Sequence, residues 1–225
     1  MPSDSFAEVA AAGCSAILDG SHGTEEPPER TGRWGPSLVF RPREELSLAL
    51  AALATEAAVR AGAHHWRSGD IGRSHVTIRA LEPYVDAIPG DRRERYLAAA
   101  RRAAAGLGPV QFAFDGVTLS TGSVMARAIP LDDRADRVRQ RLDDELADDG
   151  WLERRVFPNG RDPIWYCSVL HFAGQIADPQ ALVEWAEAQH GVSLGGASFT
   201  ELDLCTWAFD GTAMTPRVVG VASTA

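Results

Sequence analysis

The chain has 225 residues, a hydrophobic fraction of 45% and a charged fraction of 24%, which are ordinary values for a globular protein with a sizeable core. Its formal net charge of −9 opposes binding to long nucleic acids, although a few local arginines could hold a small phosphorylated ligand. All 22 cationic residues are arginine, and the absence of lysine excludes Schiff-base chemistry and the Walker A phosphate loop.

The sequence lacks the patterns of membrane proteins, secreted proteins and zinc sites. No apolar run approaches the roughly 20 residues that span a bilayer, and the N-terminus has no signal-peptide pattern. The three cysteines, Cys14, Cys167 and Cys205, lie far apart and form no C-x-x-C pair. We therefore expect free thiols, a cytoplasmic protein, no membrane contact, no structural zinc and no cofactor.

The first half of the chain alternates helical and extended patterns. Residues 4–18 are predicted to form a helix, and the Gly- and Pro-rich residues 19–32 a loop. A short strand over 37–42 ends at a proline and is followed by a helix over 43–62, which Gly62 ends. A strand over 74–81, written SHVTIRAL, comes next.

The first half continues with a helix over 91–105 and a strand over 110–120, which is antiparallel to the next strand, over 123–130. The order then repeats from that strand: a helix over 131–147, a strand over 164–174, a helix over 178–189 with Asp178 as its N-cap, and closing strands over 197–209 and 212–222. The repeat places His75 and His171 on equivalent strands, with similar rather than equal spacings. We predict an α+β fold of two pseudo-symmetric lobes, each an antiparallel sheet with outer helices, around a central cleft.

Two histidines that face each other across a cleft can perform acid–base chemistry without a metal. One neutral imidazole takes a proton from an attacking hydroxyl or water, and the other donates a proton to the leaving oxygen. Their reference pKa values, near 6.5, make both forms available at neutral pH. A lone histidine on a strand is more often structural, so the matched placement of His75 and His171 carries the hypothesis.

The residues around His75 resemble the 2H phosphoesterase superfamily, which includes LigT-type 2′-5′ RNA ligases and cyclic nucleotide phosphodiesterases. Its hallmark is a pair of H-x-[ST]-hydrophobic motifs on pseudo-symmetric lobes. His75-Val-Thr77-Ile matches fully, whereas His171-Phe-Ala173-Gly has alanine where the family has serine or threonine. The resemblance covers residues 33–222 as one bilobal domain and leaves residues 1–32, a helix and a loop, as an extension.

The resemblance implies that His75 and His171 are the acid–base pair and that Thr77 donates a hydrogen bond to phosphate. Ala173 cannot donate one, and a lost donor to a charged oxygen costs roughly 1.5–3 kcal/mol. Tyr166, Ser168 and Arg161 are candidate substitutes, but strand alternation places Trp165 rather than Tyr166 or Ser168 on the face of His171. Further candidate substrate-binding residues are Arg79, which shares the face of His75 by the same alternation, and His65, Trp66, Trp34 and Tyr84.

The favoured function is a metal-independent phosphoesterase acting on a small nucleotide-like molecule such as a 2′,3′-cyclic phosphate. One alternative is a specialised lyase, isomerase or hydrolase on the same fold that acts without phosphate, which an apolar cleft would favour. Another is a ligand-binding module without catalysis. A metal enzyme using His64 and His65 is the weakest alternative, because adjacent residues of an extended segment point to opposite faces. The sequence leaves the oligomeric state open.

Overall fold

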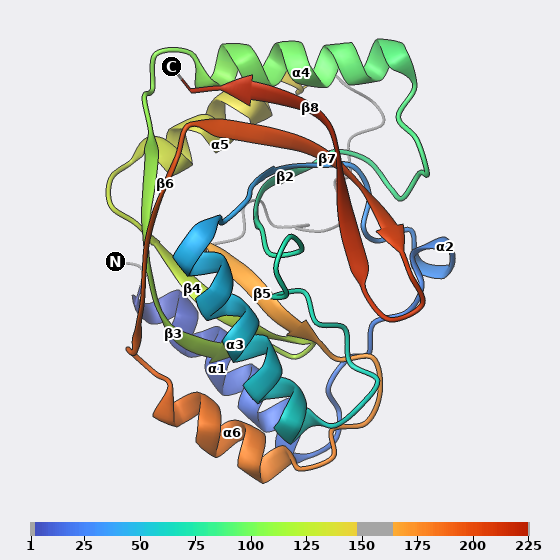
Figure 1. The fold of residues 1–225 in the computed structure, drawn as a ribbon, viewed down its shortest axis with the longest axis vertical. Helices are drawn as coiled ribbons and strands as arrows, with labels where there is room; N and C mark the ends of the chain where they lie inside the picture. Colours follow the sequence, from blue (N-terminus) through green and yellow to red (C-terminus); the bar gives the residue numbers. More distant parts are fainter. Residues whose placement is uncertain (1–2, 148–163, 225) are drawn as a thin grey trace.

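The computed structural model describes residues 3–147 and 164–224, and its centre is one curled, eight-stranded antiparallel sheet with helices packed outside (Figure 1). Across the sheet the strands are β6 (Ser193–Phe199), β3 (Val110–Leu119), β4 (Ser123–Pro130), β5 (Tyr166–His171), β2 (Val76–Ala80), β1 (Ser37–Phe40), β7 (Glu201–Phe209) and β8 (Met214–Ser223). The helices are α1 (Ser3–Leu18), α2 (Pro28–Thr31), α3 (Glu44–Ala61), α4 (Gly90–Ala104), α5 (Arg134–Glu145) and α6 (Pro179–Ala188).

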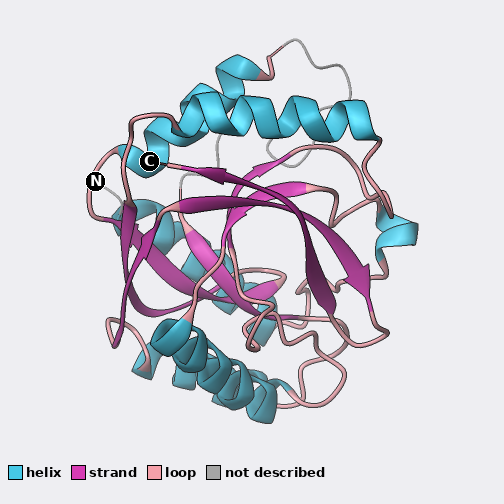
Figure 2. Cartoon of the chain, turned by 45° about the horizontal axis from the view of Figure 1, so that its top comes forward, coloured by secondary structure: helices cyan, strands magenta, loops and turns pink. Residues whose placement is uncertain are grey.

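The sheet consists of two four-stranded halves, which confirms the predicted α+β class. Helices α1, α3 and α6 pack on the half formed by β6, β3, β4 and β5, and α4 and α5 pack mainly on the half formed by β2, β1, β7 and β8 (Figure 2). The halves meet where β2 pairs with β5, at Val76 opposite Cys167. The strands of the first half, β3 to β6, are consecutive in the sequence, whereas the second half combines β1 and β2 from near the start of the chain with β7 and β8 from its end.

Local signals in the sequence explain several element boundaries. The side chain of Asp178 accepts a hydrogen bond of 2.9 Å from the Ala181 backbone N–H, which confirms the predicted N-cap of α6. Gly62 follows α3 with a φ of 98°, a conformation that favours glycine. The described residues contain no helix that is long and apolar enough to cross a membrane.

The predicted strand over residues 197–209 is two strands. The chain passes from β6 to β7 at Thr200, and these strands lie in different halves: β6 pairs with β3, whereas β7 pairs with β1 and β8. The sequence on both sides of Thr200 has β propensity, so the local pattern contains no sign of this change of partner. The predicted loop over residues 19–32 contains the short helix α2.

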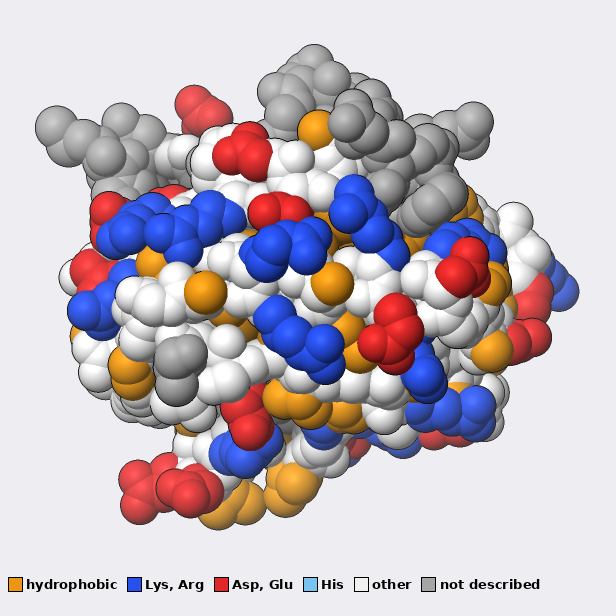
Figure 3. All heavy atoms as spheres, turned by 90° about the horizontal axis from the view of Figure 1, so that it is seen from above, with side chains coloured by type: hydrophobic (Ala, Val, Ile, Leu, Met, Phe, Trp, Pro, Cys, Tyr) orange, Lys and Arg blue, Asp and Glu red, His pale blue; other side chains and the backbone are white. Residues whose placement is uncertain are grey.

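The arginines of α4 do not form an open basic face. Arg92 forms an ion pair with Glu82, and Arg102 pairs with Glu145 at 2.7 Å. Figure 3, which views the molecule from above, shows arginine and carboxylate side chains intermingled. Carboxylates beside these arginines weaken the positive potential that a nucleic-acid backbone would meet.

Gly35 is required by a close backbone approach. A Cβ at this position would lie 1.6 Å from the carbonyl oxygen of Glu82. We expect Gly35→Ala to lower the free energy of unfolding by roughly 2–4 kcal/mol, because backbone must move to admit the methyl group. Urea unfolding would measure the change. Gly90→Ala is the control, since nothing lies within 4 Å of a Cβ there; an equal loss in both variants would contradict the prediction.

Candidate active site

The two central strands bring His75 and His171 to one cluster of aromatic side chains with Trp34, Trp66 and Trp207, and the region around these five residues is called the cleft below. His75 lies immediately before β2, and His171 is the last residue of β5. Both are buried, with 9% and 8% of their surface exposed, and His75 is close enough for its charge to lower the pKa of His171. The structure thus brings together the two histidines that the sequence singled out.

Tryptophan rings form the wall between the histidines. The ring centroid of Trp34 lies 4.9 Å from that of His171 and 6.3 Å from that of His75. Trp207 lies 4.4 Å from His75 and 5.3 Å from Trp34. Trp66 exchanges two backbone hydrogen bonds of 2.9 Å with His171 and contacts Trp34 at 6.3 Å. Trp34 has a φ of 65°, which is costly for a bulky residue, so the surrounding packing must hold it in place.

The tautomer of His75 follows from its hydrogen bond. Its Nδ1 lies 3.0 Å from the carbonyl oxygen of Arg73, so Nδ1 carries the proton and Nε2 keeps its lone pair. Burial lowers the pKa of His75 to about 4; the bond to Arg73 opposes this shift, and the Arg41 guanidinium adds to it. His75 is therefore neutral at pH 7 and suited to accept a proton at Nε2.

His171 has a carboxylate neighbour that the sequence analysis missed. Its Nδ1 lies 3.7 Å from Oε2 of Glu25, whose side chain is only 3% exposed. Burial, followed by the charges of Arg33 and His75, lowers the pKa of His171 to about 3. Burial raises the pKa of Glu25, whereas Arg33 and a hydrogen bond from Trp34 lower it. No motif marked Glu25, because it lies in a segment read as a loop.

Two β-bulges change which side chains face the cleft. In β5, Val169 and Leu170 are consecutive and both fully buried in the main core, and the register with β4 shifts between Ser168 and Leu170. The alternation therefore reverses before His171. Trp165 packs in the main core instead, with its Nε1 donating to Asp136 of α5 at 3.2 Å. The prediction that Trp165 shares the face of His171 is corrected for this reason.

Because of the same bulge, Ser168 lies on the same face of β5 as His171, the face toward the cleft. Val76 and Cys167, which pair across β2 and β5, both belong to the main core. The next residues along the two antiparallel strands, His75 and Ser168, lie opposite each other on the other face. Ser168, which simple alternation had disfavoured, is therefore a neighbour of His75.

A second bulge separates Thr77 from Arg79. Thr77 is exposed and pairs with Val39, which packs in the cluster that contains Trp66 and Trp207. The register between β1 and β2 shifts after Thr77, and Arg79 forms an ion pair of 3.3 Å with Asp143 of α5. Thr77 thus lies on the cleft side, whereas Arg79 is directed to the outer helix, contrary to the predicted alternation.

The remaining predicted residues have structural contacts or lie elsewhere. His65 is buried; its Nδ1 accepts the Ala173 N–H at 3.1 Å and its Nε2 lies 3.0 Å from the Ala61 carbonyl oxygen, so both ring nitrogens are occupied. Tyr84 packs beside the tryptophan cluster and donates to Asp86 at 2.8 Å. Arg161 lies outside the described residues. Among the described residues no three His, Cys, Asp or Glu side chains are grouped to hold a metal.

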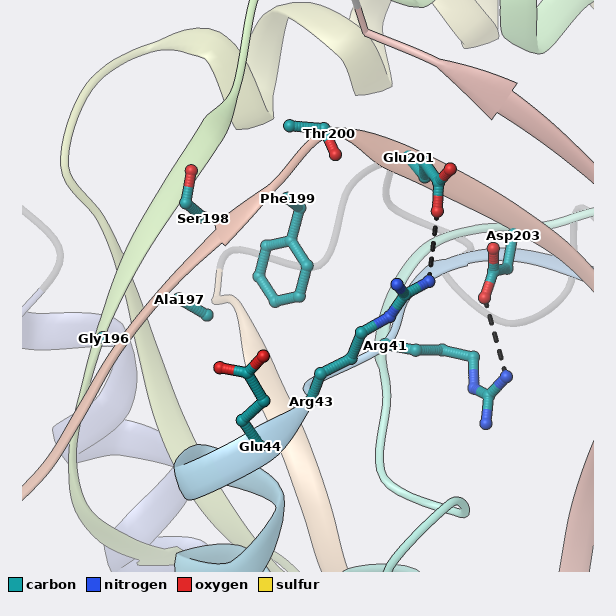
Figure 4. A pocket seen from close by; sticks show the side chains of 10 residues that line it. All are labelled: Arg41, Arg43, Glu44, Gly196, Ala197, Ser198, Phe199, Thr200, Glu201 and Asp203. Atoms are coloured by element: carbon teal, nitrogen blue, oxygen red, sulfur yellow. Dashed lines mark hydrogen bonds and ion pairs between the residues drawn. The ribbon is translucent and has the colours of Figure 1, made fainter.

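A pocket of about 350 Å³ lies apart from the histidines, where β6 passes into β7 (Figure 4). Its arginines are paired: Arg43 with Glu201 at 3.1 Å, and Arg41 with Asp203 at 3.6 Å. Each of these cations has a carboxylate partner, and neither histidine lines this pocket, so the pocket is separate from the histidine pair.

Comparison with solved structures identifies the fold. TT0787 of Thermus thermophilus superposes with a TM-score of 0.58 at 15% identity, over 84% of this chain and 97% of that one. LigT of E. coli in complex with 3′-AMP gives a TM-score of 0.60 at 11% identity, with the same coverage, and a phosphoesterase gives 0.59 at 11%. No family model and no curated protein matches the sequence.

We expect acid to destabilise the protein through the buried histidines. Between pH 6.5 and the lowered pKa of His171, the unfolded chain binds a proton that the native chain does not. Stability therefore falls with decreasing pH, by up to about 1.4 kcal/mol per pH unit for this group. Urea unfolding between pH 7 and pH 5 measures how the free energy of unfolding changes with pH, and this change should be smaller for His171→Gln than for the unaltered protein. His190→Gln, at an exposed position, is the control, and an unchanged pH dependence in His171→Gln would contradict the assignment.

Proposed function

We propose that this chain is a metal-independent phosphoesterase acting on a small nucleotide-like substrate, such as a 2′,3′-cyclic phosphate. Its fold, which is similar to that of LigT, TT0787 and a phosphoesterase, supports the predicted resemblance to the 2H phosphoesterase superfamily. The observation that carries the proposal is the placement of His75 and His171 on the two central strands, on either side of Trp34. We also propose a cytoplasmic location, with which the free cysteines agree.

The proposed reaction uses the two histidines in different roles. Nε2 of His75 takes a proton from a water molecule as its oxygen bonds to phosphorus. The bond from phosphorus to the leaving ribose oxygen breaks, and that oxygen takes a proton from Nε2 of His171. A phosphate anion in the cleft raises the pKa of a nearby histidine, which favours the protonated form that His171 needs.

Binding of the substrate is divided between hydroxyl groups and an aromatic ring. Thr77 and Ser168 lie on the cleft side and donate to phosphate oxygens, so that Ser168 replaces the donor that Ala173 lacks. Trp34 is half-buried and offers a ring for stacking of a nucleobase. Crystal structures of E. coli LigT in complex with 3′-AMP, NADP+ and ATP support a small nucleotide ligand for this proposal.

A second candidate is an enzyme that uses the same histidines on a substrate without phosphate. The cleft favours it in one respect: its nearby arginines are already paired, Arg33 with Glu25 at 3.1 Å and Arg41 with Asp203 at 3.6 Å. A phosphate would have to compete with these carboxylates. The tryptophan wall would suit an aromatic or apolar substrate.

Phosphorus NMR without added metal distinguishes the two candidates. We expect turnover of at least one member of a panel of 2′,3′-cyclic nucleotides and 2′-5′ dinucleotides. His75→Ala and His171→Ala should each reduce the rate by roughly 10²–10⁴-fold, because each removes one proton-transfer group. His190→Ala, which changes an exposed histidine, is the control. Activity that survives both cleft variants would refute the two-histidine mechanism, and no turnover of any member would favour the second candidate.

A further inference from the structure

The loop that precedes β1 is held against the end of β5. In this N-terminal strap, residues 19–34, the Gly23 N–H donates to the Thr121 carbonyl oxygen at 2.7 Å, and the Glu25 N–H donates to the Phe172 carbonyl oxygen at 2.5 Å. His22 Nε2 lies 3.1 Å from the carbonyl oxygen of Gly174. These contacts with the turn between β3 and β4 and with the residues that follow β5 position the strap beside His171.

The strap places a buried carboxylate, that of Glu25, beside Nδ1 of His171. Oε1 of Glu25 accepts a hydrogen bond of 3.1 Å from Trp34 Nε1, and Oε2 lies 3.1 Å from Arg33. The same Oε2 is 3.7 Å from His171 Nδ1, an ion-pair distance. A buried carboxylate is costly unless each oxygen has a partner, so the position of Glu25 is specified by Trp34, Arg33 and His171 together.

We infer that Glu25 is a positioning residue for His171: its carboxylate, at ion-pair distance from Nδ1, favours a proton on that nitrogen, so that Nε2 presents the second proton to the leaving oxygen. This inference rests on the proposed function and assigns a role to a residue outside both histidine motifs. A carboxylate beside one imidazole nitrogen sets the tautomer and orientation of the ring and stabilises its protonated form.

The proton count defines the working state. In that state the His171 ring carries two protons, one on Nδ1 and one on Nε2, beside the ionised Glu25 carboxylate. When Nε2 gives its proton to the leaving oxygen, the other proton stays on Nδ1, leaving neutral His171 beside the Glu25 carboxylate. His75 meanwhile holds the proton taken from water, so exchange with solvent restores both groups.

The titratable and charged groups near His171 are Glu25, Arg33 and His75, and Arg41 is near His75. Arg33 and His75 both oppose a positive charge on His171, and burial opposes it too. Glu25 is therefore the one described neighbour in this set that favours the protonated ring. Its removal should make the acid form harder to reach.

The test compares Glu25→Gln with Glu26→Gln, which makes the same chemical change at the adjacent, exposed carboxylate. With a cyclic nucleotide substrate, we expect Glu25→Gln to lower kcat roughly 100-fold with little change in KM. The acid must be protonated to act, so activity falls as pH rises through the pKa of the pair. Loss of the carboxylate should move this alkaline limb to lower pH, by at least about one unit.

Glu25→Asp should recover part of kcat and part of the pH shift, and it keeps the proposal testable if Glu25→Gln does not fold. Nitrogen-15 NMR of the histidine rings gives a readout that needs no turnover. In the unaltered protein and in Glu26→Gln, the nitrogen-15 shifts should show a proton on Nδ1 of His171. In Glu25→Gln these shifts should change.

Identical pH profiles and identical His171 NMR signatures for Glu25→Gln and Glu26→Gln would overturn the inference. Loss of kcat in Glu25→Gln with an unmoved alkaline limb would also overturn it, because a purely structural role predicts that result. If the unaltered protein turned over no phosphoester, the proposed function would fail, and the NMR comparison would still decide whether Glu25 favours the proton on Nδ1 of His171.

Discussion

The antiparallel contact between β2 and β5 joins the two halves of the sheet at Val76 and Cys167, whose side chains are fully buried. Because each strand carries a histidine near this contact, the same pairing that closes the core also assembles the cleft. A shift of either strand by one residue would turn every side chain to the opposite face. Stability and the geometry of the site are therefore controlled by one register.

Several polar side chains around the cleft are buried away from water, and each has its own hydrogen-bond or ion-pair partners. His75 donates to the backbone of Arg73, so it can remain neutral at little cost. His65 uses both nitrogens to hold the chain around Ala173. Glu25 depends on neighbours from its own strap and on His171. Burial makes these groups sensitive to one another, because charges interact more strongly where water is excluded.

Irregular backbone determines what reaches the substrate side. The bulge at Val169 and Leu170 directs Trp165 into the core and Ser168 to the cleft, and the shift after Thr77 directs Arg79 to α5. Regular alternation predicts each of these positions on the wrong face. Bulges are common beside functional sites because they redirect single side chains without changing the strand order. Here one bulge offers the hydroxyl of Ser168 as a donor near His75, whereas the second motif, at His171, has Ala173 in place of a donor.

The sequence by itself determined the α+β class, most helices and strands, and the pair of histidines, because these depend on local periodicity, on caps such as Asp178 and on short motifs. The tertiary structure alone decided the bulges, the passage of the chain at Thr200 and the place of Glu25 beside His171. Those features arise from contacts between segments far apart in the chain. A local pattern carries no information about such contacts, since their energy exists only after the distant strands have paired.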